Sequence, residues 1–231
     1  MIGTTVDSIA IIVGSLIGIL FKKGINEKIS KTVMNGLALC VLFIGVSNII
    51  DTYNKFESNS MLIIIISMVI GSIIGEIIDI DKRIENLGNT IEVKLKKSGG
   101  QIAEGFVTTS LLFCIGAMAI IGSLESGLSG NHKTLFAKSI IDGITSIIFA
   151  SSLGIGVMLS AISVFVYQGI ITLGASFLKV ILIQSVITNM TAIGGILIIG
   201  LGFNVLGMTK IKVANLLPGI FLPILYQIVT T

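Results

Sequence analysis

The sequence predicts an all-α polytopic membrane protein, with about eight transmembrane helices arranged as repeated helical hairpins. Hydrophobic residues make up 53% of the 231-residue chain, charged residues only 12%, and the mean hydropathy is +1.05. A soluble domain averages about 25% charged residues, so this chain lacks the polar side chains to cover a water-facing surface. Its apolar residues also fall into runs of about 20, the length that a helix needs to cross the hydrocarbon core. We therefore expect a single integral membrane domain over residues 1–231.

The apolar runs at residues 2–21, 31–50, 61–78 and 105–124 predict the first four spans. No Lys or Arg precedes the first run, and Lys22 and Lys23 follow it, which is the reverse of a secretory signal. Residues 1–21 are therefore predicted to be a retained span. The stretch 134–173 has room for two spans with a hinge at SSLGIG (151–156), and residues 190–207 and 215–231 complete the set.

The basic residues orient these spans, because cytoplasmic loops are enriched in Lys and Arg. With both termini outside, the loops after the first, third and seventh spans are cytoplasmic. These loops carry eleven of the fifteen basic residues: Lys22, Lys23, Lys28, Lys31, Lys82, Arg83, Lys94, Lys96, Lys97, Lys210 and Lys212. If residues 174–189 crossed the membrane, this asymmetry would shrink, so we expect them to form a re-entrant or interfacial segment.

The cytoplasmic loop at residues 79–104 is predicted to contain a short amphipathic helix that lies on the membrane surface. Ile84, Leu87, Ile91 and Leu95 recur every three or four residues, with charged residues between them. A helix in contact with a partner protein is the alternative interpretation.

Two similar segments predict an internal repeat. IIVGSLIGIL (11–20) aligns with MVIGSIIGEI (68–77), which places Gly14 and Gly18 opposite Gly71 and Gly75. LALCVLFIGVS (37–47) loosely matches LLFCIGAMAIIGS (111–123), and ILIIGLG (196–202) resembles the first pattern again. The GxxxG spacing lets helix backbones approach closely. We expect this packing within the chain, with a homo-oligomer through the Gly-rich helix faces as the alternative.

No cofactor is expected, and neither is a nucleic-acid partner. Cys40 and Cys114 both lie in apolar segments and are predicted to be small buried hydrophobes. The single histidine, His132, has no Cys or His cluster near it, so a zinc or redox site has no support. The motifs of ATP-driven pumps and of the common hydrolases are absent from the sequence, and no enzymatic activity is predicted.

Three ionisable residues inside the predicted spans are the strongest candidates for function, because a charge in the membrane costs several kcal/mol, roughly 2.5–3.5 on insertion scales. Asp142 lies in AKSIIDGITSIIFA (137–150), and Lys138 lies four residues before it on the same helix face. The two side chains form either a structural ion pair or part of a pathway for a cation or a proton, with a sodium site at Asp142 as one form of the second interpretation. Asp7 lies in GTTVDS beside hydroxyl side chains that suit a hard cation, unless it reaches the outer surface or caps the helix.

Uncharged polar residues near predicted helix breaks form a second group of candidates. Asn189 and Thr191 belong to ITNMTAIGG, which is polar and Gly-rich like the broken helices of transporters. Backbone groups freed at Gly154–156 or at Pro218 could serve the same purpose. We expect Asn189 and Thr191 to join Asp142, Lys138 and Asp7 along the pathway.

Long blocks of the chain resemble the YqgA-like family of bacterial inner-membrane proteins, a family of unknown function. The resemblance rests on GTTVDSIAIIVGSLIG, SLLFCIGAMAIIGSLESGL, KSIIDGITSIIFASSLGIGVMLSA, YQGIITL and KVANLLPGIF. It implies a multi-spanning bacterial membrane protein, for which a sodium channel or pump is the expected activity. The motif with Lys138 and Asp142 belongs to the family pattern, whereas this sequence has Asp7 where an asparagine is expected.

The leading hypothesis is a protein of the bacterial plasma membrane that moves a small cation, sodium or a proton, as a channel or a gradient-driven carrier. Its partners are then the lipid bilayer and the cation. Two alternatives remain open: a secondary carrier of a small metabolite, and a membrane organising protein that transports nothing. An organiser would have a dry core in which Asp142 is held by Lys138.

Overall fold

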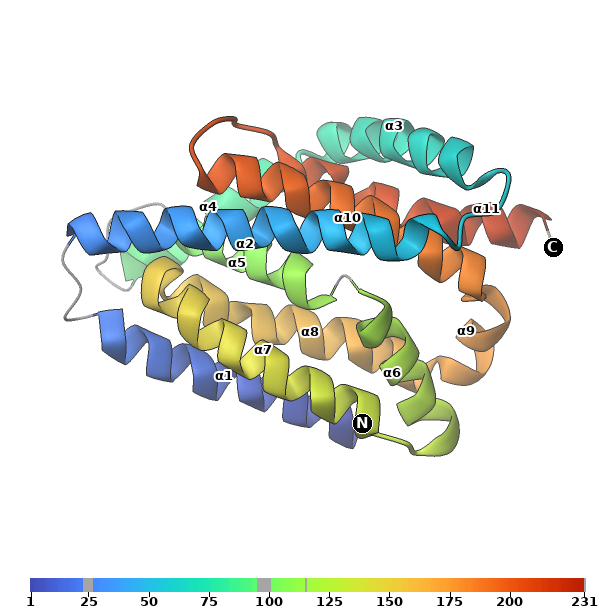
Figure 1. The fold of residues 1–231 in the computed structure, drawn as a ribbon, viewed down its shortest axis with the longest axis horizontal. Helices are drawn as coiled ribbons and strands as arrows, with labels where there is room; N and C mark the ends of the chain where they lie inside the picture. The colour runs from blue at the N-terminus through green and yellow to red at the C-terminus, as the bar shows by residue number, and fades with distance from the viewer. Residues whose placement is uncertain (23–26, 95–100, 115, 231) are drawn as a thin grey trace. The chain divides into compact units, whose positions relative to one another are not determined.

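The computed structural model describes residues 1–22, 27–94, 101–114 and 116–230, and all regular elements in those ranges are helices (Figure 1). Six helices are long and apolar enough to cross a membrane: α1 (Ile2–Lys22), α2 (Glu27–Tyr53), α3 (Ser60–Ile78), α7 (Lys133–Leu153), α8 (Ile155–Leu173) and α10 (Gln184–Val205). A bent pair, α5 (Gln101–Cys114) and α6 (Ala117–Ser129), makes a seventh candidate. The shorter elements are α4 (Ile80–Lys94), α9 (Ala175–Ile181), the 3₁₀ helix η1 (Val213–Phe221) and α11 (Leu222–Thr230). The prediction of a polytopic helical membrane protein is confirmed.

The chain divides into two compact units that alternate along the sequence. Unit 1 comprises Met1–Met34, Ile84–Cys114 and Met118–Ser176, and unit 2 comprises Asn35–Arg83, Ile115–Ala117 and Phe177–Thr231. The two helices that carry the repeated GxxxG pattern fall in different units, α1 in unit 1 and α3 in unit 2. The segments with Cys40 and Cys114 are also divided, so each of the first two predicted hairpins contributes one helix to each unit.

In unit 1, α1 and α7 run side by side in the same direction (blue and yellow in Figure 1). A Cβ atom on Gly3 would contact Leu135, one on Gly14 would meet Gly143, and one on Gly18 would meet Ile147. The two helices are therefore parallel, and the glycines allow their backbones to come into contact along the seam. The first GxxxG pair is thus used inside the chain.

Helices α5 and α8 of unit 1 run opposite to α1. Thr4 of α1 pairs with Thr172 near the end of α8, and Ser110 of α5 pairs with Ser163 of α8. The turn between α7 and α8 is Gly154, whose φ of 71° suits glycine. The predicted hinge at 151–156 is therefore confirmed.

Helices α5 and α6 form one bent pair. Gly105 of α5 packs against Leu153 at the end of α7, whereas Gly122 of α6 packs against Leu135 at its start. The pair thus runs the length of α7, with a bend of 59° between the two parts. The predicted span at 105–124 is therefore broken rather than continuous, and Gly116 at the break has a φ of 153°.

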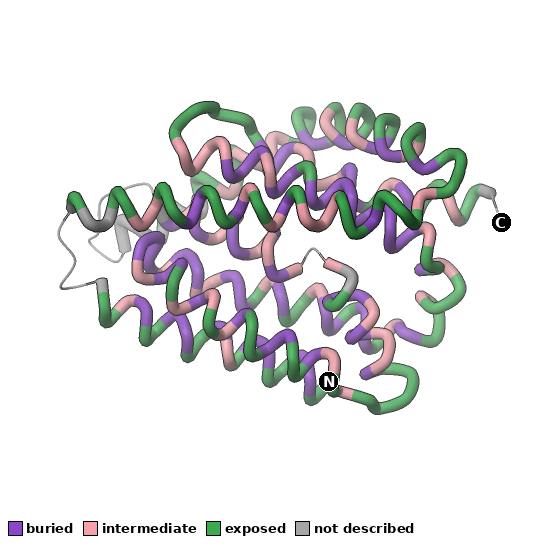
Figure 2. The backbone as a smooth tube through the Cα atoms, viewed as in Figure 1, coloured by how far each residue is buried: buried purple, intermediate pink, exposed green. Residues whose placement is uncertain are grey.

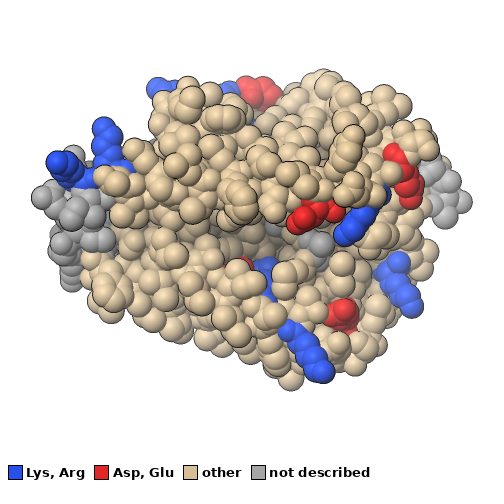
Figure 3. Space-filling view, in the orientation of Figure 1, with Lys and Arg blue, Asp and Glu red and all other residues tan. Residues whose placement is uncertain are grey.

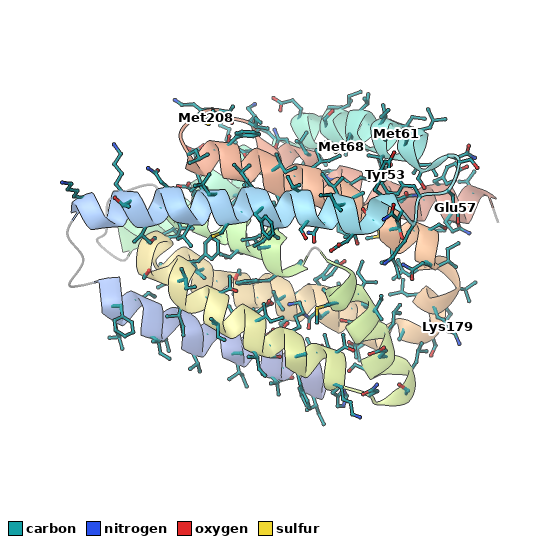
Figure 4. All side chains as sticks on the ribbon, viewed as in Figure 1. Tyr53, Glu57, Met61, Met68, Lys179 and Met208 are labelled. Atoms are coloured by element: carbon teal, nitrogen blue, oxygen red, sulfur yellow. The ribbon has the colours of Figure 1, made fainter. Side chains whose placement is uncertain are left out.

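Unit 2 repeats the use of glycine at helix seams. A Cβ atom on Gly71 would meet Gly219, and one on Gly75 would meet Asn215, so η1 runs antiparallel to α3. Gly45 of α2 likewise meets Gly195 of α10. Tyr53, at the end of α2, and Met208, after α10, mark opposite ends of this unit (Figure 4). The second GxxxG pair is therefore also used inside the chain.

The last predicted span, 215–231, is two short helices instead of one long one. A 3₁₀ helix rises about 2.0 Å per residue and an α-helix about 1.5 Å. The nine residues of η1 and the nine of α11 therefore reach about 31 Å, close to the hydrocarbon thickness of about 30 Å. The predicted count of about eight spans holds only if this composite segment crosses.

Two predicted boundaries need correction. Residues 184–189 belong to α10, which continues unbroken through Asn189 and Thr191, so the part of 174–189 outside a long helix is 174–183, with α9 in it. Thr191 donates its hydroxyl hydrogen to the carbonyl of Ile187, which satisfies it inside the helix. In the loop 79–104, α4 ends at Lys94 and residues 101–104 begin α5. Ile84 is half-buried, the side chains of Leu87 and Ile91 are not described, and Leu95 lies outside the described residues.

The outward faces of the long helices are apolar, as contact with lipid requires. On α1, Ile9, Val13, Leu16 and Leu20 are exposed while buried residues alternate with them (Figure 2). The face drawn in Figure 3 is mostly uncharged, with Lys, Arg, Asp and Glu in scattered groups. Cys114 is half-buried, but Cys40 is exposed, so the prediction that both cysteines are buried is wrong for Cys40. An apolar segment can present a small hydrophobe to lipid as readily as to a core.

Candidate functional site

Four polar side chains meet inside unit 1, where α1, α7 and α8 pack together. We call Asp7, Lys138, Asp142 and Gln168 the buried cluster. The Nζ of Lys138 donates to Asp7 Oδ2 at 2.8 Å and also to Asp142 Oδ2. The Nε2 of Gln168 donates to the same Oδ2 of Asp7 at 2.6 Å. The ion pair between Lys138 and Asp142 is thus confirmed, and Asp7 joins it from another helix.

Helical periodicity brings these residues together. On α1 the buried positions Thr4, Asp7, Ile11 and Gly14 recur every three or four residues and face α7 and α8. On α7, Lys138 and Asp142 are one turn apart on the buried face. Since α1 and α7 run in parallel, Asp7 lies level with Lys138, while Gln168 arrives from the antiparallel α8.

The cluster is almost completely buried. Asp7 and Gln168 are 0% exposed, and Lys138 and Asp142 are 6% exposed. The alternative interpretation, in which Asp7 reaches the outer surface, is therefore wrong, because Lys138 and Gln168 bind its carboxylate inside the unit. A buried charge survives only when it is paired and hydrogen-bonded.

The charges of the cluster do not balance. Two carboxylates face one ammonium, so the group carries a net charge of −1 when all three are ionised. Asp7 and Asp142 accept from the same ammonium group of Lys138, which brings the two carboxylates close together. An uncompensated charge in a low-dielectric interior is costly, which favours uptake of one positive charge, a proton or a monovalent cation.

Two oxygen atoms of the cluster have no hydrogen-bond partner among the described residues. They are Oδ1 of Asp7 and Oε1 of Gln168. Ser8 Oγ, on the residue after Asp7, is also buried and without a partner there. Thr4 pairs with Thr172 instead, and Thr5 donates to the carbonyl of Met1, so these hydroxyls are already used.

The last turn of α5 lies beside the cluster. Cys114 is the last residue of α5, and Ile11, which lies one helical turn after Asp7 on α1, is among its apolar neighbours. It packs against an apolar group of Ile11, Phe113, Ala161 and Val164, which closes one side of the site. A discontinuous helix beside buried charges is the arrangement that ion-binding sites in transporters use.

The other predicted site residues lie elsewhere. Asn189 and Thr191 are buried on α10 in unit 2, so α1, α7 and α8 form the cluster without them. Pro218 lies inside η1 of unit 2, and Gly154 is the turn between α7 and α8. Asn189 Oδ1 has no partner among the described residues.

Gln168 is the residue that sequence reasoning did not select. It is one of many uncharged polar residues in the predicted spans, and nothing in YQGIITL distinguishes an amide that binds a carboxylate from one that bonds a neighbouring helix. The signal in the sequence is the spacing of four residues between Gln168 and Thr172, which places both side chains on one face of the helix.

A second polar group lies in unit 2, where α3 meets η1. Asn215 donates to Glu76 Oε2 at 2.6 Å and accepts from the amide of Asp81 at 2.7 Å. Lys212 donates to Glu76 Oε1 at 2.6 Å, and this hydrogen bond and the charge of Glu76 raise the pKa of Lys212 above its usual value. Glu76 and Lys212 are exposed, so this group fixes a helix junction in contact with solvent.

In the described part of the chain, three or more His, Cys, Asp or Glu side chains do not converge in a way that could hold a metal ion. Comparison with known proteins gives a match to a family model over residues 2–228, and that family is described as "Protein of unknown function (DUF554)". The chain belongs to this family. The match supports the resemblance noted in the sequence, but it adds nothing on sodium transport.

Two curated relatives are similar over nearly the whole length. The "Uncharacterized membrane protein YdfK" of Bacillus subtilis (strain 168) is 36% identical over 96% of this chain and 94% of its own. The "Uncharacterized protein YqgA" of Escherichia coli (strain K12) is 26% identical over the same shares. No solved structure matches this chain. These members of the family are thus membrane proteins or uncharacterised proteins by name.

Proposed function

We propose that this protein moves a small cation, a proton or sodium, across the bacterial plasma membrane, and that the buried cluster binds the ion in transit. The observation that carries the proposal is the unequal charge of the cluster, where Lys138 faces both Asp7 and Asp142. A purely structural pair needs one carboxylate for one ammonium, and the second carboxylate costs energy unless a further positive charge joins it.

The surroundings of the cluster support the same proposal. Asp7 contributes an unpartnered oxygen atom, and the first helix of the bent α5–α6 pair ends at Cys114, which packs against the apolar neighbours of the cluster. Both features are typical of sites that bind and release an ion within the membrane. Transport needs no chemical step, so we propose a channel or gradient-driven carrier and no enzymatic activity.

Flux into proteoliposomes tests the proposal. Purified protein is reconstituted, and proton and sodium entry are followed with separate fluorescent indicators under an imposed gradient. We expect flux with the native protein and its loss in Asp142→Asn, which leaves Asp7 and Lys138 as a balanced pair. The matched control is Asp51→Asn, the same change at an exposed carboxylate of α2. Absence of both ion fluxes in the native protein, with the protein folded, would reject transport of these ions.

The membrane organiser is the second candidate, because Lys138 binds both carboxylates in the structure. It predicts no flux and a large loss of thermal stability in Asp142→Asn. Ion flux through the native protein therefore separates the two functions, and the melting temperature on the same samples shows whether each variant is folded.

A further inference from the structure

The two unpartnered oxygens of the buried cluster belong to side chains that already share one hydrogen bond. Gln168 Nε2 donates to Asp7 Oδ2 at 2.6 Å, while Asp7 Oδ1 and Gln168 Oε1 have no partner among the described residues. Both unpartnered atoms accept hydrogen bonds, and both residues are 0% exposed. Two buried acceptors on bonded neighbours require a donor.

A carboxylic acid and a primary amide can supply that donor to each other. In such a pair the amide N–H donates to one acid oxygen, and the acid O–H on the other oxygen donates to the amide carbonyl. The first of these bonds is present between Gln168 and Asp7. One proton on Asp7 Oδ1 would complete the second bond and satisfy both unpartnered atoms.

The same proton balances the cluster. With Asp7 neutral, Lys138 and Asp142 remain as one ammonium and one carboxylate in direct contact. A sodium ion would also balance the charge, but a hard cation takes about six oxygen ligands. The unpartnered oxygens of Asp7, Ser8 and Gln168 offer fewer than that.

We infer that the ion bound by the buried cluster is a proton, carried on Asp7 Oδ1 and hydrogen-bonded to Gln168 Oε1. Around Asp7, α7 contributes Lys138 and Asp142, which share the ammonium group of Lys138, and α8 contributes the Gln168 amide. The thiol of Cys114 at the end of α5 packs against the apolar neighbours of the cluster. Lys138 contacts both carboxylates, but the Gln168 amide bonds to Asp7, which makes Asp7 the carrier and leaves Asp142 as the carboxylate beside Lys138. This inference identifies the ion of the proposed function. The bound proton is argued from the structure alone, and only its movement across the membrane rests on the proposed function.

Infrared difference spectroscopy of the full-length protein in lipid tests the inference directly. A protonated buried carboxyl has a carbonyl band above the amide bands that shifts in deuterium oxide. We expect this band at neutral pH in the native protein and in the Asp51→Asn control, and its absence in Asp7→Asn. Replacement of sodium by choline in the buffer should leave the band unchanged.

Gln168→Met, which keeps the length of the side chain and removes the amide, shows which carboxyl carries the proton. Loss of the hydrogen bond from the acid should move the carbonyl band to higher frequency. A native protein without the band, a band that Gln168→Met does not move, or a band that sodium abolishes would each overturn the inference. The second of these results would place the proton on Asp142, and the third would make sodium the ion.

Stability provides an independent measurement if Gln168→Met folds poorly. Asn at position 7 reproduces the protonated acid, because its amide donates to Gln168 Oε1 and accepts from Nε2. We therefore expect Asp7→Asn to keep the native melting temperature and Asp142→Asn to lower it, and the reverse order would overturn the inference. A carbonyl band without proton flux would reject the proposed transport but keep the proton on Asp7. Proton flux without the band would reject the proton on Asp7 but keep the proposed transport.

Discussion

Lys138 holds the buried cluster together, because its ammonium group donates to carboxylates on two helices. Its methylene chain crosses the seam between α1 and α7, so the charge is brought to the carboxylates rather than to solvent. Removal of one member of a buried ion pair leaves a charge without compensation, which costs more than the pair itself contributes. A single substitution at this site should therefore lower the free energy of unfolding more than a double substitution that removes both partners.

Lys138→Met should lower the free energy of unfolding by about 3–5 kcal/mol, because it leaves buried carboxylates without their ammonium partner. The double variant Lys138→Met/Asp142→Leu should recover most of this loss, since an apolar pair of similar size replaces the ion pair. Unfolding in mixed micelles by added SDS measures both values. Lys133→Met, at the exposed start of α7, is the control and should change stability by no more than about 0.5 kcal/mol. A double variant as unstable as the single one would mean that Asp7 remains charged without Lys138.

Asn215 has an equivalent linking role in unit 2, although its own side chain is neutral. Its side chain is 2% exposed and joins η1 to Glu76 of α3 and to the amide of Asp81 at the start of α4. Asn215→Ala should lower the free energy of unfolding by about 1–3 kcal/mol, the cost of a buried polar group left unsatisfied. Asn54→Ala, in the exposed connection after α2, is the control. Equal stability of the two variants would show that water replaces the Asn215 side chain.

At the scale of elements, the glycine seams carry the most specific packing. A Cβ atom at Gly14 would overlap the carbonyl of Gly143, and one at Gly75 would overlap the backbone of Asn215. By contrast, a Cβ atom at Gly36 of α2 would have no neighbour within 4 Å. The three positions therefore allow the same substitution to be compared at seam and surface.

Gly14→Ala and Gly75→Ala should each cost about 1–3 kcal/mol, because the added methyl group forces backbones apart. Gly36→Ala should be neutral or stabilising by up to about 1 kcal/mol, since alanine favours the helix over glycine. Thermal unfolding in detergent measures all three. An equal loss of stability in Gly36→Ala would mean that overlap at a seam within the chain is not the cause. A partner chain that packs on α2 would then have to be sought.

The elements were predictable where one property decided them. Apolar length alone located α1, α2, α3, α7 and α8, and the hinge at Gly154 followed from SSLGIG. The break at Gly116 was not predicted, because CIGAMAI is apolar throughout and a sequence does not show where a backbone bends. The opposite error occurred at ITNMTAIGG, where polar residues and glycines suggested a break, but Gly195 packs on Gly45 and Thr191 bonds within α10.

The buried cluster was only partly predictable for a related reason. Lys138 and Asp142 share a helix, so their spacing of four residues identified the pair. Asp7 and Gln168 join them from helices distant in the sequence, and their contact depends on the parallel packing of α1 with α7. That packing follows from the Gly14–Gly143 contact, which no single segment of the sequence contains.

At the scale of the whole molecule, the remaining question is which ends of the helices face the cytoplasm. Within unit 1, α1 and α7 are parallel to each other, and α5 and α8 run in the opposite direction. Within unit 2, α2 is antiparallel to α10, and η1 is antiparallel to α3. These directions agree with an alternating path in which α5 and α6 count as one crossing. With the loops rich in Lys and Arg on the cytoplasmic side, this path predicts that both termini lie outside.

Labelling of single cysteines in intact cells tests this orientation. Starting from a variant with Cys40→Ala and Cys114→Ala, we would introduce Lys55→Cys, Lys82→Cys, Lys133→Cys or Lys210→Cys. All four positions are exposed: two lie between long helices, one lies in the first turn of α4 and one begins α7. A maleimide that cannot cross the membrane should label positions 55 and 133 in intact cells, and positions 82 and 210 only after lysis. Labelling of position 210 from outside would mean that residues 174–183 cross the membrane, and that the positive charges of Lys210 and Lys212 lie on the outer face. Labelling of 82 from outside with protection of 133 would reverse the whole orientation and place the start of α1, and with it Asp7, nearer to the cytoplasm.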